Sequence, residues 1–203
     1  MTYLNPARIC IARHGETDWN TAEILQGWTD VEINETGRRQ AHELALTLAS
    51  SGFDHIYSSP LIRALETAEI IAGVLQLGPP LIHDGLKERH FGAIQGVPKA
   101  ELAALNPALL QQIRRRNPAA LFPQGESMNV FADRVLHALT SIAGKHSGMR
   151  LLVITHGWVL DVIFRHINGF PRSEVLNLKR KNGEFLWLEV TEESICSSTS
   201  EVL

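Results

Sequence analysis

Two His-Gly pairs are the residues of this chain best suited to covalent chemistry. His14-Gly15 and His156-Gly157 each follow a short apolar run. A neutral imidazole can attack phosphorus when its other ring nitrogen is held as a donor. Gly15 permits close backbone approach and offers a carbonyl for that ring proton. A lone histidine at a strand end is usually structural, so His14 becomes a candidate nucleophile only through its neighbours.

Two arginines lie where they could bind a phosphoryl group. Arg13 directly precedes His14, and Arg63 follows Ser58-Ser59-Pro60. Phosphoryl transfer needs fixed donors around the outer oxygens, and a guanidinium meets two oxygens at once. For either arginine alone, a surface ion pair is the commoner explanation. Together with His156 as a further donor, the set favours a phosphate site.

Glu88 is the candidate proton donor for the leaving oxygen. A carboxylic acid kept neutral by burial and by a nearby phosphate can serve as general acid. Asp84 and Glu16 are weaker candidates for the same task. The charged sequence Lys87-Glu88-Arg89 also fits a solvated loop.

The elements that must position these residues read as alternating strands and helices. Buried strands are predicted at 9–12, 55–57, 81–83 and 151–155, and helices at 37–48, 61–77, 101–116, 127–146 and 157–167. Asn106-Pro107 should divide the third helix into two. This alternation predicts an α/β fold with a largely parallel sheet covered by helices on both faces. Ligands of such folds bind beyond the carboxyl ends of the strands, where His14, Arg63, Glu88 and His156 would meet.

The C-terminal part departs from this alternation. Segments 175–178 and 184–190 are predicted to pair as a hairpin around Lys181-Asn182-Gly183. Residues 191–203 are rich in Ser, Thr and Glu, which predicts a poorly ordered tail. We therefore expect one catalytic domain over residues 1–203, with a helical cap segment around 97–122 and a disordered end at 191–203.

The composition restricts which partners and which cellular location we expect. The 203 residues are 44% hydrophobic and 20% charged, with a formal net charge of −3. This balance gives no long-range attraction to nucleic acid or to an anionic membrane. Two cysteines far apart, no secretory signal and no apolar run of membrane-spanning length predict a cytoplasmic protein.

Several ordered motifs resemble the histidine phosphatase superfamily in its phosphoglycerate mutase-like branch. They are RHGETDWN at 13–20, LQGWTDVEINETGRRQA at 25–41, YSSPLIRALETAEII at 57–71, LKERHFGAIQG at 86–96, PQGES at 123–127 and VITHGWVLDVI at 153–163. The resemblance covers most of the chain from Ile9 to about Ile167.

The resemblance implies a three-layer α/β/α sandwich and a phosphatase acting through a phosphohistidine. His14 would be phosphorylated, Glu88 would give and recover a proton, and Arg13, Arg63 and His156 would bind the phosphoryl group. Substrate-binding positions would be Asn20, Gln26, Gly27, Gly157 and Trp158. No metal or other cofactor is implied, and the partner is a small phosphate ester; a homodimer is one hypothesis for the assembly.

Two departures from the family pattern bear on the substrate. Trp158 stands where many relatives have a small residue, and Asp161 stands where an arginine is frequent. Trp158 would either shape the substrate cavity or pack on the sheet. His90, Ala104, Leu105, Leu109, Arg115 and Phe122 are expected to form part of a cap, and Arg114-Arg115-Arg116 is read as a solvated helix end from which one arginine could reach a substrate anion.

Hydrolysis is favoured over the alternatives. A mutase must retain the phosphoryl group until it is returned, and the related mutases carry a long basic insertion where this chain has the compact segment 89–122. Phosphoglycerate mutase-type transfer is the second hypothesis. A metalloenzyme is a further alternative, but the chain has no recognised metal-binding spacing. A non-catalytic phospholigand sensor would not need both a nucleophile and an acid.

Overall fold

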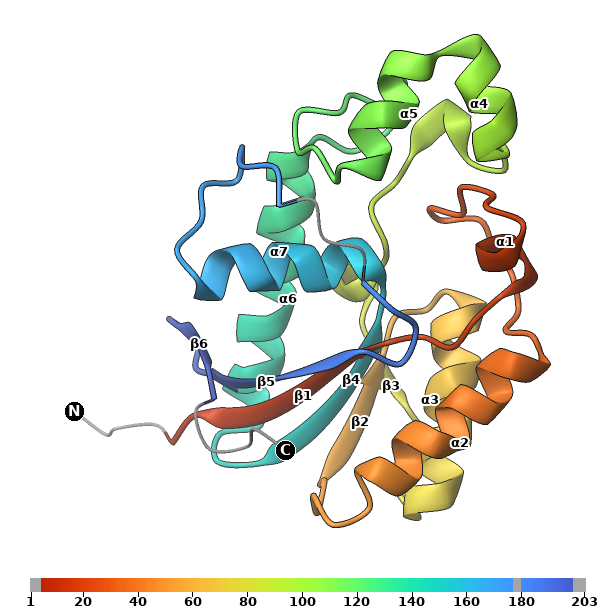
Figure 1. The fold of residues 1–203 in the computed structure, drawn as a ribbon. Coiled ribbons are helices and arrows are strands. Elements are labelled where there is room, and N and C mark those ends of the chain that lie inside the picture. Colours follow the sequence, from red (N-terminus) through yellow and green to blue (C-terminus); the bar gives the residue numbers. More distant parts are fainter. Residues whose placement is uncertain (1–4, 177–179, 199–203) are drawn as a thin grey trace.

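A six-stranded sheet forms the centre of the molecule, as Figure 1 shows. A computed structural model describes residues 5–176 and 180–198. The strands are β1 (Ala7–Arg13), β2 (His55–Ser58), β3 (Leu81–Ile82), β4 (Arg150–Thr155), β5 (Phe185–Val190) and β6 (Ile195–Ser197). Their order is β3-β2-β4-β1-β5-β6. The first four strands are parallel to one another, whereas β5 pairs antiparallel with both β1 and β6. The largely parallel α/β sheet expected from the sequence is confirmed.

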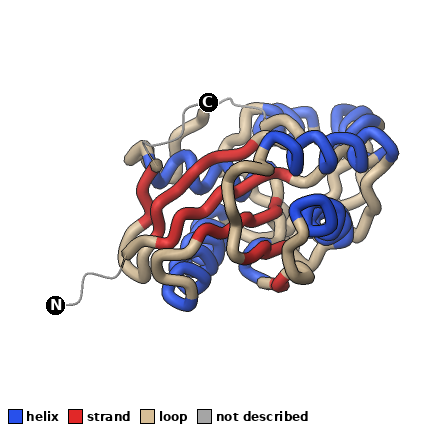
Figure 2. Tube along the Cα trace, turned by 90° about the horizontal axis from the view of Figure 1, so that it is seen from below, coloured by secondary structure: helices blue, strands red, loops and turns tan. Residues whose placement is uncertain are grey.

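Helices cover both faces of this sheet (Figures 1 and 2). One face carries α2 (Glu35–Thr47) and α3 (Ile62–Leu75), and the other carries α6 (Met128–Lys145) and α7 (Gly157–Ile167). Alternate strand residues face the two layers: Cys10 and Ala12 pack with α2 and α3, whereas Ile9 and Ile11 pack with α6 and α7. The three-layer sandwich follows from β1, β2 and β4, which are buried on both faces. The expectation of a buried strand at 81–83 is wrong in one respect: β3 is an edge strand, and both Leu81 and Ile82 are exposed.

A smaller helical unit lies apart from these layers, above the sheet in the view of Figure 1. It consists of α4 (Lys99–Leu105) and α5 (Pro107–Arg114), which are divided at Asn106-Pro107 as expected. The Asn106 side chain caps α5 by accepting from the Leu109 amide at 3.0 Å, and proline occupies its first turn. Short elements that sequence periodicity does not reveal are α1 (Asp18–Thr21) and the 3₁₀ turns at Asp84–Leu86 and Gly92–Ile94.

The C-terminal part differs from expectation in two respects. Asn182-Gly183 does form a turn, with Gly183 at φ +73°, and β5 follows it. However, β5 pairs with β1 and β6; residues 175 and 176 are loop, and 177–178 lie outside the described residues. The expectation of a poorly ordered tail over 191–203 is wrong for Ile195–Ser197, whose backbone pairs with β5; residues 199–203 are not described.

Candidate active site

Parallel pairing of β1 with β4 places the two His-Gly pairs side by side. Arg13 lies opposite Thr155 in the ladder, so that His14 and His156 follow neighbouring strand ends. The backbone amide of His14 donates to the carbonyl of Thr155 at 2.9 Å. The two imidazole rings are 5.1 Å apart between centroids. Two histidines that are 142 positions apart in the sequence thus meet at one edge of the sheet.

The hydrogen bond that a nucleophilic His14 requires is present. Its Nδ1 lies 2.6 Å from the carbonyl oxygen of Gly15. A carbonyl oxygen can only accept, so Nδ1 carries the proton and Nε2 keeps its lone pair. Burial, and then the charges of Arg63 and Arg13, lower the pKa of His14 well below its ordinary value. The ring is therefore held neutral, which is the reactive form.

Gly15, in the loop after β1, packs against Gly37 of α2 too closely for either residue to carry a side chain. A Cβ on Gly15 would lie 2.5 Å from the carbonyl oxygen of Gly37. The amide of Gly15 also donates to the Thr67 hydroxyl at 3.0 Å. These contacts fix the backbone that carries His14 against α2 and α3.

Arg63 reaches the site from the first turn of α3. Its side chain is 1% exposed, and its two terminal nitrogens donate to the carbonyls of Gly27 and Thr29 at 2.7 and 3.0 Å. Gly27 has a φ of +54°, and a Cβ there would meet the Gln95 side chain at 2.2 Å. Burial lowers the pKa of Arg63 to about 10, so the side chain stays cationic at neutral pH. Its Nε has no hydrogen-bond partner within the described residues.

Arg13 and His156 add further donors. Arg13 donates through Nη1 to the carbonyl of Arg180 at 2.6 Å, and burial lowers its pKa to about 10. His156 Nε2 lies 2.8 Å from the hydroxyl of Ser59, whose amide is held by the end of β4. Over the described part of the chain, Arg13 Nε and His156 Nδ1 are buried without a hydrogen-bond partner. A buried unpaired donor such as the N–H at Arg13 Nε is costly, and a bound anion would satisfy it. His156 Nδ1 would donate to the same anion in the tautomer whose Nε2 accepts from the Ser59 hydroxyl.

Glu88 follows the 3₁₀ turn at Asp84–Leu86, and its buried carboxyl lies against the first turn of α7. It is 8% exposed, and its two oxygens accept from the backbone amides of Arg89 at 2.9 Å and Trp158 at 3.4 Å. Burial raises its pKa above the ordinary value, against the opposing charge of Arg116 and those amide bonds. The other two candidates differ: Asp84 is 79% exposed and pairs with Lys87, whereas Glu16 lines the cavity.

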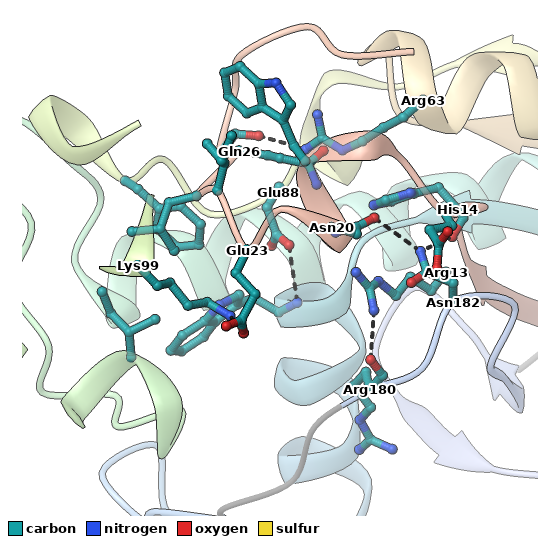
Figure 3. Close-up of a pocket in the computed structure, with 18 of the residues that line it drawn as sticks. Arg13, His14, Asn20, Glu23, Gln26, Arg63, Glu88, Lys99, Arg180 and Asn182 are labelled. Atoms are coloured by element: carbon teal, nitrogen blue, oxygen red, sulfur yellow. Dashed lines mark hydrogen bonds and ion pairs between the residues drawn. The ribbon is translucent and has the colours of Figure 1, made fainter. Parts of the chain in front are cut away.

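One cavity of about 360 Å³ unites these groups (Figure 3). Eight of the ten expected site residues line it: Arg13, His14, Asn20, Gln26, Gly27, Arg63, Glu88 and Trp158. His156 and Gly157 do not line the cavity, although the ring of His156 lies 5.1 Å from that of His14. Thr17 orients Asn20 through a reciprocal capping pair and accepts from Gln26 at 2.9 Å. α7 begins at Gly157, and a helix N-terminus favours anions.

The cap contributes different residues from those expected. Phe91, Lys99, Ile113, Arg114 and Arg116 line the cavity, in place of His90, Ala104, Leu105, Leu109, Arg115 and Phe122. Leu105 is 72% exposed, and Phe122 packs against Phe91 instead. The interpretation of Arg114-Arg115-Arg116 as a solvated helix end is wrong for two of the three residues, because Arg114 and Arg116 line the cavity. Glu23, Arg180 and Asn182 also line the cavity, and Asn182 alone had a signal in the sequence, as a turn residue.

Neither a metal cluster nor a membrane span is found in the parts of the chain that the structure describes. No three His, Cys, Asp or Glu side chains within 5–176 and 180–198 group as a metal site. In the same residues, every helix is too short or too polar to cross a bilayer.

Comparison with known proteins identifies the family. The model of the histidine phosphatase superfamily, branch 1, matches residues 9–199. The chain is 39% identical over 175 residues to phosphoglycerate mutase-like protein 4 of Arabidopsis thaliana, covering 84% of this chain and 76% of that protein. It is 39% identical over 161 residues to a metal-independent phosphoserine phosphatase of the same plant, covering 78% and 68%.

A solved structure agrees in fold. The mycobacterial glucosyl-3-phosphoglycerate phosphatase superposes with a TM-score of 0.82 at 26% identity, over 90% of this chain and 92% of that one. The chain belongs to the histidine phosphatase superfamily. It is an enzyme with the phosphatase function of that superfamily.

Proposed function

We propose that this enzyme hydrolyses a small phosphate monoester in two steps through a phosphohistidine. Nε2 of His14 attacks phosphorus while Glu88 protonates the departing oxygen. Glu88, now ionised, then takes a proton from the water that attacks the phosphohistidine, which restores both groups. Arg13, Arg63 and His156 bind the phosphoryl oxygens, with the amide of Gly157 as a further donor. Asn20, Gln26, Gly27 and Trp158 contact the substrate.

One observation carries this proposal: His14, Arg13, Arg63 and Glu88 line the same cavity. The two steps need three kinds of group: a nucleophile, cations that bind the phosphoryl oxygens, and a proton donor. Here they are a neutral imidazole with its proton on Nδ1, two arginines, and a carboxyl of raised pKa. Mere binding of a phosphate would need only the cations. In this proposal the chain forms one catalytic domain with 97–122 as its cap; a cytoplasmic location and a homodimer stay predictions.

The test is turnover of p-nitrophenyl phosphate by His14→Ala. Loss of a covalent nucleophile should lower kcat by several orders of magnitude while the thermal transition stays cooperative. His42→Ala is the matched control, because His42 is exposed on α2. Turnover of His14→Ala within about tenfold of wild type would refute the assignment.

Mutase-type transfer is tested in the same preparation. With labelled 3-phosphoglycerate, release of inorganic phosphate supports hydrolysis. Conversion to 2-phosphoglycerate without release would favour the mutase. The chain has the compact segment 89–122 where a mutase would need a longer segment to close over the ligand, which supports hydrolysis.

A further inference from the structure

Arg134 lies behind the proton donor and outside the lining of the cavity. It belongs to α6, and its side chain is 21% exposed. Its guanidinium faces residues 85–88, the segment that ends in Glu88. The two steps proposed above give Arg134 no task, although it makes more hydrogen bonds to this segment than any cavity residue does.

All five N–H groups of that guanidinium have a partner. Nη1 donates to the carbonyl oxygens of Gly85 and Lys87, both at 3.0 Å. Nη2 donates to the carbonyl oxygen of Glu88 at 3.2 Å and to Oε2 of Glu126 at 2.8 Å. Nε donates to Oε1 of Glu126 at 2.9 Å. No other side chain offers five donors in one plane, so a single residue holds three carbonyls of one short segment.

Glu126 orients this guanidinium. The two bonds from Nε and Nη2 to its carboxylate form a bidentate pair, which fixes the plane of the guanidinium. Oε2 of Glu126 also accepts from the backbone amide of His90 at 2.9 Å, and its own amide donates to the carbonyl of His90 at 3.0 Å. The carbonyl of Glu126 accepts from Nε of Arg89 at 3.1 Å. Glu126 and Arg134 together thus hold the chain on both sides of Glu88.

Two further side chains hold the same segment. Nε1 of Trp28 donates at 2.6 Å to the carbonyl oxygen of Glu88 that Arg134 also contacts. The hydroxyl of Thr155, at the end of β4, donates to the carbonyl of Leu86 at 2.7 Å. Each carbonyl of residues 85–88 therefore accepts a side-chain donor, and Arg134 supplies the donor at three of the four.

The carboxyl of Glu88 is held less firmly than its backbone. Its bonds from the amides of Arg89 and Trp158 are 2.9 and 3.4 Å long. A general acid must lie within hydrogen-bond reach of the leaving oxygen, and a misplacement of about 1 Å can cost about 10²-fold in rate. The position of this carboxyl therefore depends on the backbone that Arg134 holds.

We propose that Arg134 is a positioning residue for Glu88, and that Glu126 orients Arg134 for this task. The proton that Glu88 gives to the leaving oxygen, and later takes from water, then moves at a fixed place in the cavity. Neither Arg134 nor Glu126 lines the cavity, so their effect on the reaction passes through Glu88. The inference rests on the proposed function and extends it to a pair of residues that the substrate does not touch.

The test compares kcat/KM for two esters in Arg134→Gln. Because kcat/KM includes no step after the leaving group departs, it reports the first step alone. Ethyl phosphate needs a proton on its leaving oxygen, whereas the aryl oxide of p-nitrophenyl phosphate leaves without one. Arg134→Gln should lower kcat/KM for ethyl phosphate by roughly 10- to 100-fold and for p-nitrophenyl phosphate by less than about threefold. A residue that only stabilised the fold would affect both esters alike.

Arg172→Gln and Asp133→Asn are the matched controls. Asp133 precedes Arg134 on α6 and forms an exposed ion pair with Arg172 at 2.7 Å. These variants remove an ion pair from the same helix without touching residues 85–88, so both esters should keep the wild-type kcat/KM.

Two milder variants keep the test decisive if Arg134→Gln does not unfold cooperatively. Arg134→Lys keeps the charge but has three donors in place of five. Glu126→Gln keeps Arg134 but removes the charge that orients it. Both should show the selective loss for ethyl phosphate, with a smaller magnitude than Arg134→Gln.

A double variant separates this role from an effect on His156. Burial, and then nearby charges that include Arg134, lower the pKa of His156, so Arg134 has a second route into the site. On ethyl phosphate, Glu88→Gln/Arg134→Gln should stay within about threefold of Glu88→Gln, because the position of an absent acid no longer matters. A further loss beyond that range would assign the effect to His156 and contradict the inference.

Equal losses for both esters in Arg134→Gln, or no loss in any of the three variants, would overturn the inference. These outcomes leave the proposed function intact as long as His14→Ala is inactive and Glu88→Gln is selectively slow on ethyl phosphate. If Glu88→Gln shows no such selectivity, the proposed role of Glu88 fails and the inference fails with it.

Discussion

One carboxyl oxygen of Glu88 accepts a hydrogen bond of 3.4 Å from the backbone amide of Trp158, in the first turn of α7. The other oxygen accepts a hydrogen bond of 2.9 Å from the backbone amide of Arg89. Both bonds favour the ionised carboxylate, yet burial outweighs them and raises the pKa of Glu88. The long bond to Trp158 leaves that oxygen able to serve a leaving group, and this relationship supports the role of Glu88 as the acid.

Glu88→Gln should separate good from poor leaving groups. Because the amide cannot donate the proton that an alkoxide needs, kcat/KM for ethyl phosphate should fall by about 10²- to 10⁴-fold. An aryl oxide leaves without a proton, so p-nitrophenyl phosphate should lose much less in its first step. Steady-state and burst kinetics on both esters measure the difference.

Asp84→Asn is the control for this experiment, since Asp84 is an exposed carboxylate four positions earlier. Equal losses of Glu88→Gln for both esters in the burst phase would show that Glu88 does not protonate the leaving group.

The pH profile of kcat/KM should have its acid limb well below the ordinary histidine pKa. His14 must be neutral to attack, and its lowered pKa keeps it neutral as the pH falls. Glu88 must be protonated, and its raised pKa extends the acid form to higher pH. Activity should therefore fall on the acid side as His14 gains a proton and on the alkaline side as Glu88 loses its proton.

The comparison of wild type with Glu88→Gln tests this assignment, because the ionisation of the substrate is common to both. Glu88→Gln should lose the part of the alkaline limb that belongs to Glu88, with ethyl phosphate as the substrate. An unchanged alkaline limb would assign that ionisation to another group.

Gly15→Ala should destabilise the fold, whereas Gly73→Ala should stabilise it. A Cβ on Gly15 would press on the backbone of Gly37, at a cost of about 1–3 kcal/mol. Gly73 lies in α3, is exposed, and would meet nothing within 4 Å, so alanine should add about 1 kcal/mol through its helix propensity. Chemical denaturation of both variants measures the effects; a neutral Gly15→Ala would contradict the close packing.

The sequence was sufficient for the parallel sheet and for eight of the twenty residues that line the cavity. The strands that end at Arg13, Ser58 and Thr155 contain short apolar runs, and parallel pairing brings their ends to one edge of the sheet. Local sequence patterns therefore implied a contact between distant residues. Asn106-Pro107 indicated the break between α4 and α5, because helix capping by Asn106 and the backbone restriction of Pro107 depend only on neighbouring residues.

The cap residues could not be predicted in the same way. The direction of the Arg116 side chain depends on the left-handed backbone turn at Arg116 and on the ion pair with Asp161. Asp161 is 45 positions further along the chain, so no local pattern indicates this contact. Arg180 likewise enters through a hydrogen bond of its carbonyl to Arg13. β6 has only three residues, of which Ile195 alone is buried, and it lies in a segment rich in Ser, Thr and Glu. The composition therefore indicated a tail where an edge strand pairs with β5.

Trapping the phosphorylated enzyme tests the central claim most directly. The protein is mixed with a ³²P-labelled phosphate ester, quenched within milliseconds, and divided between acid and base. A label that acid removes and base preserves, and that is absent from His14→Ala, is the result that phosphorylation of the His14 imidazole predicts. A label that survives acid, or one that His14→Ala carries to the same extent as wild type, would contradict it.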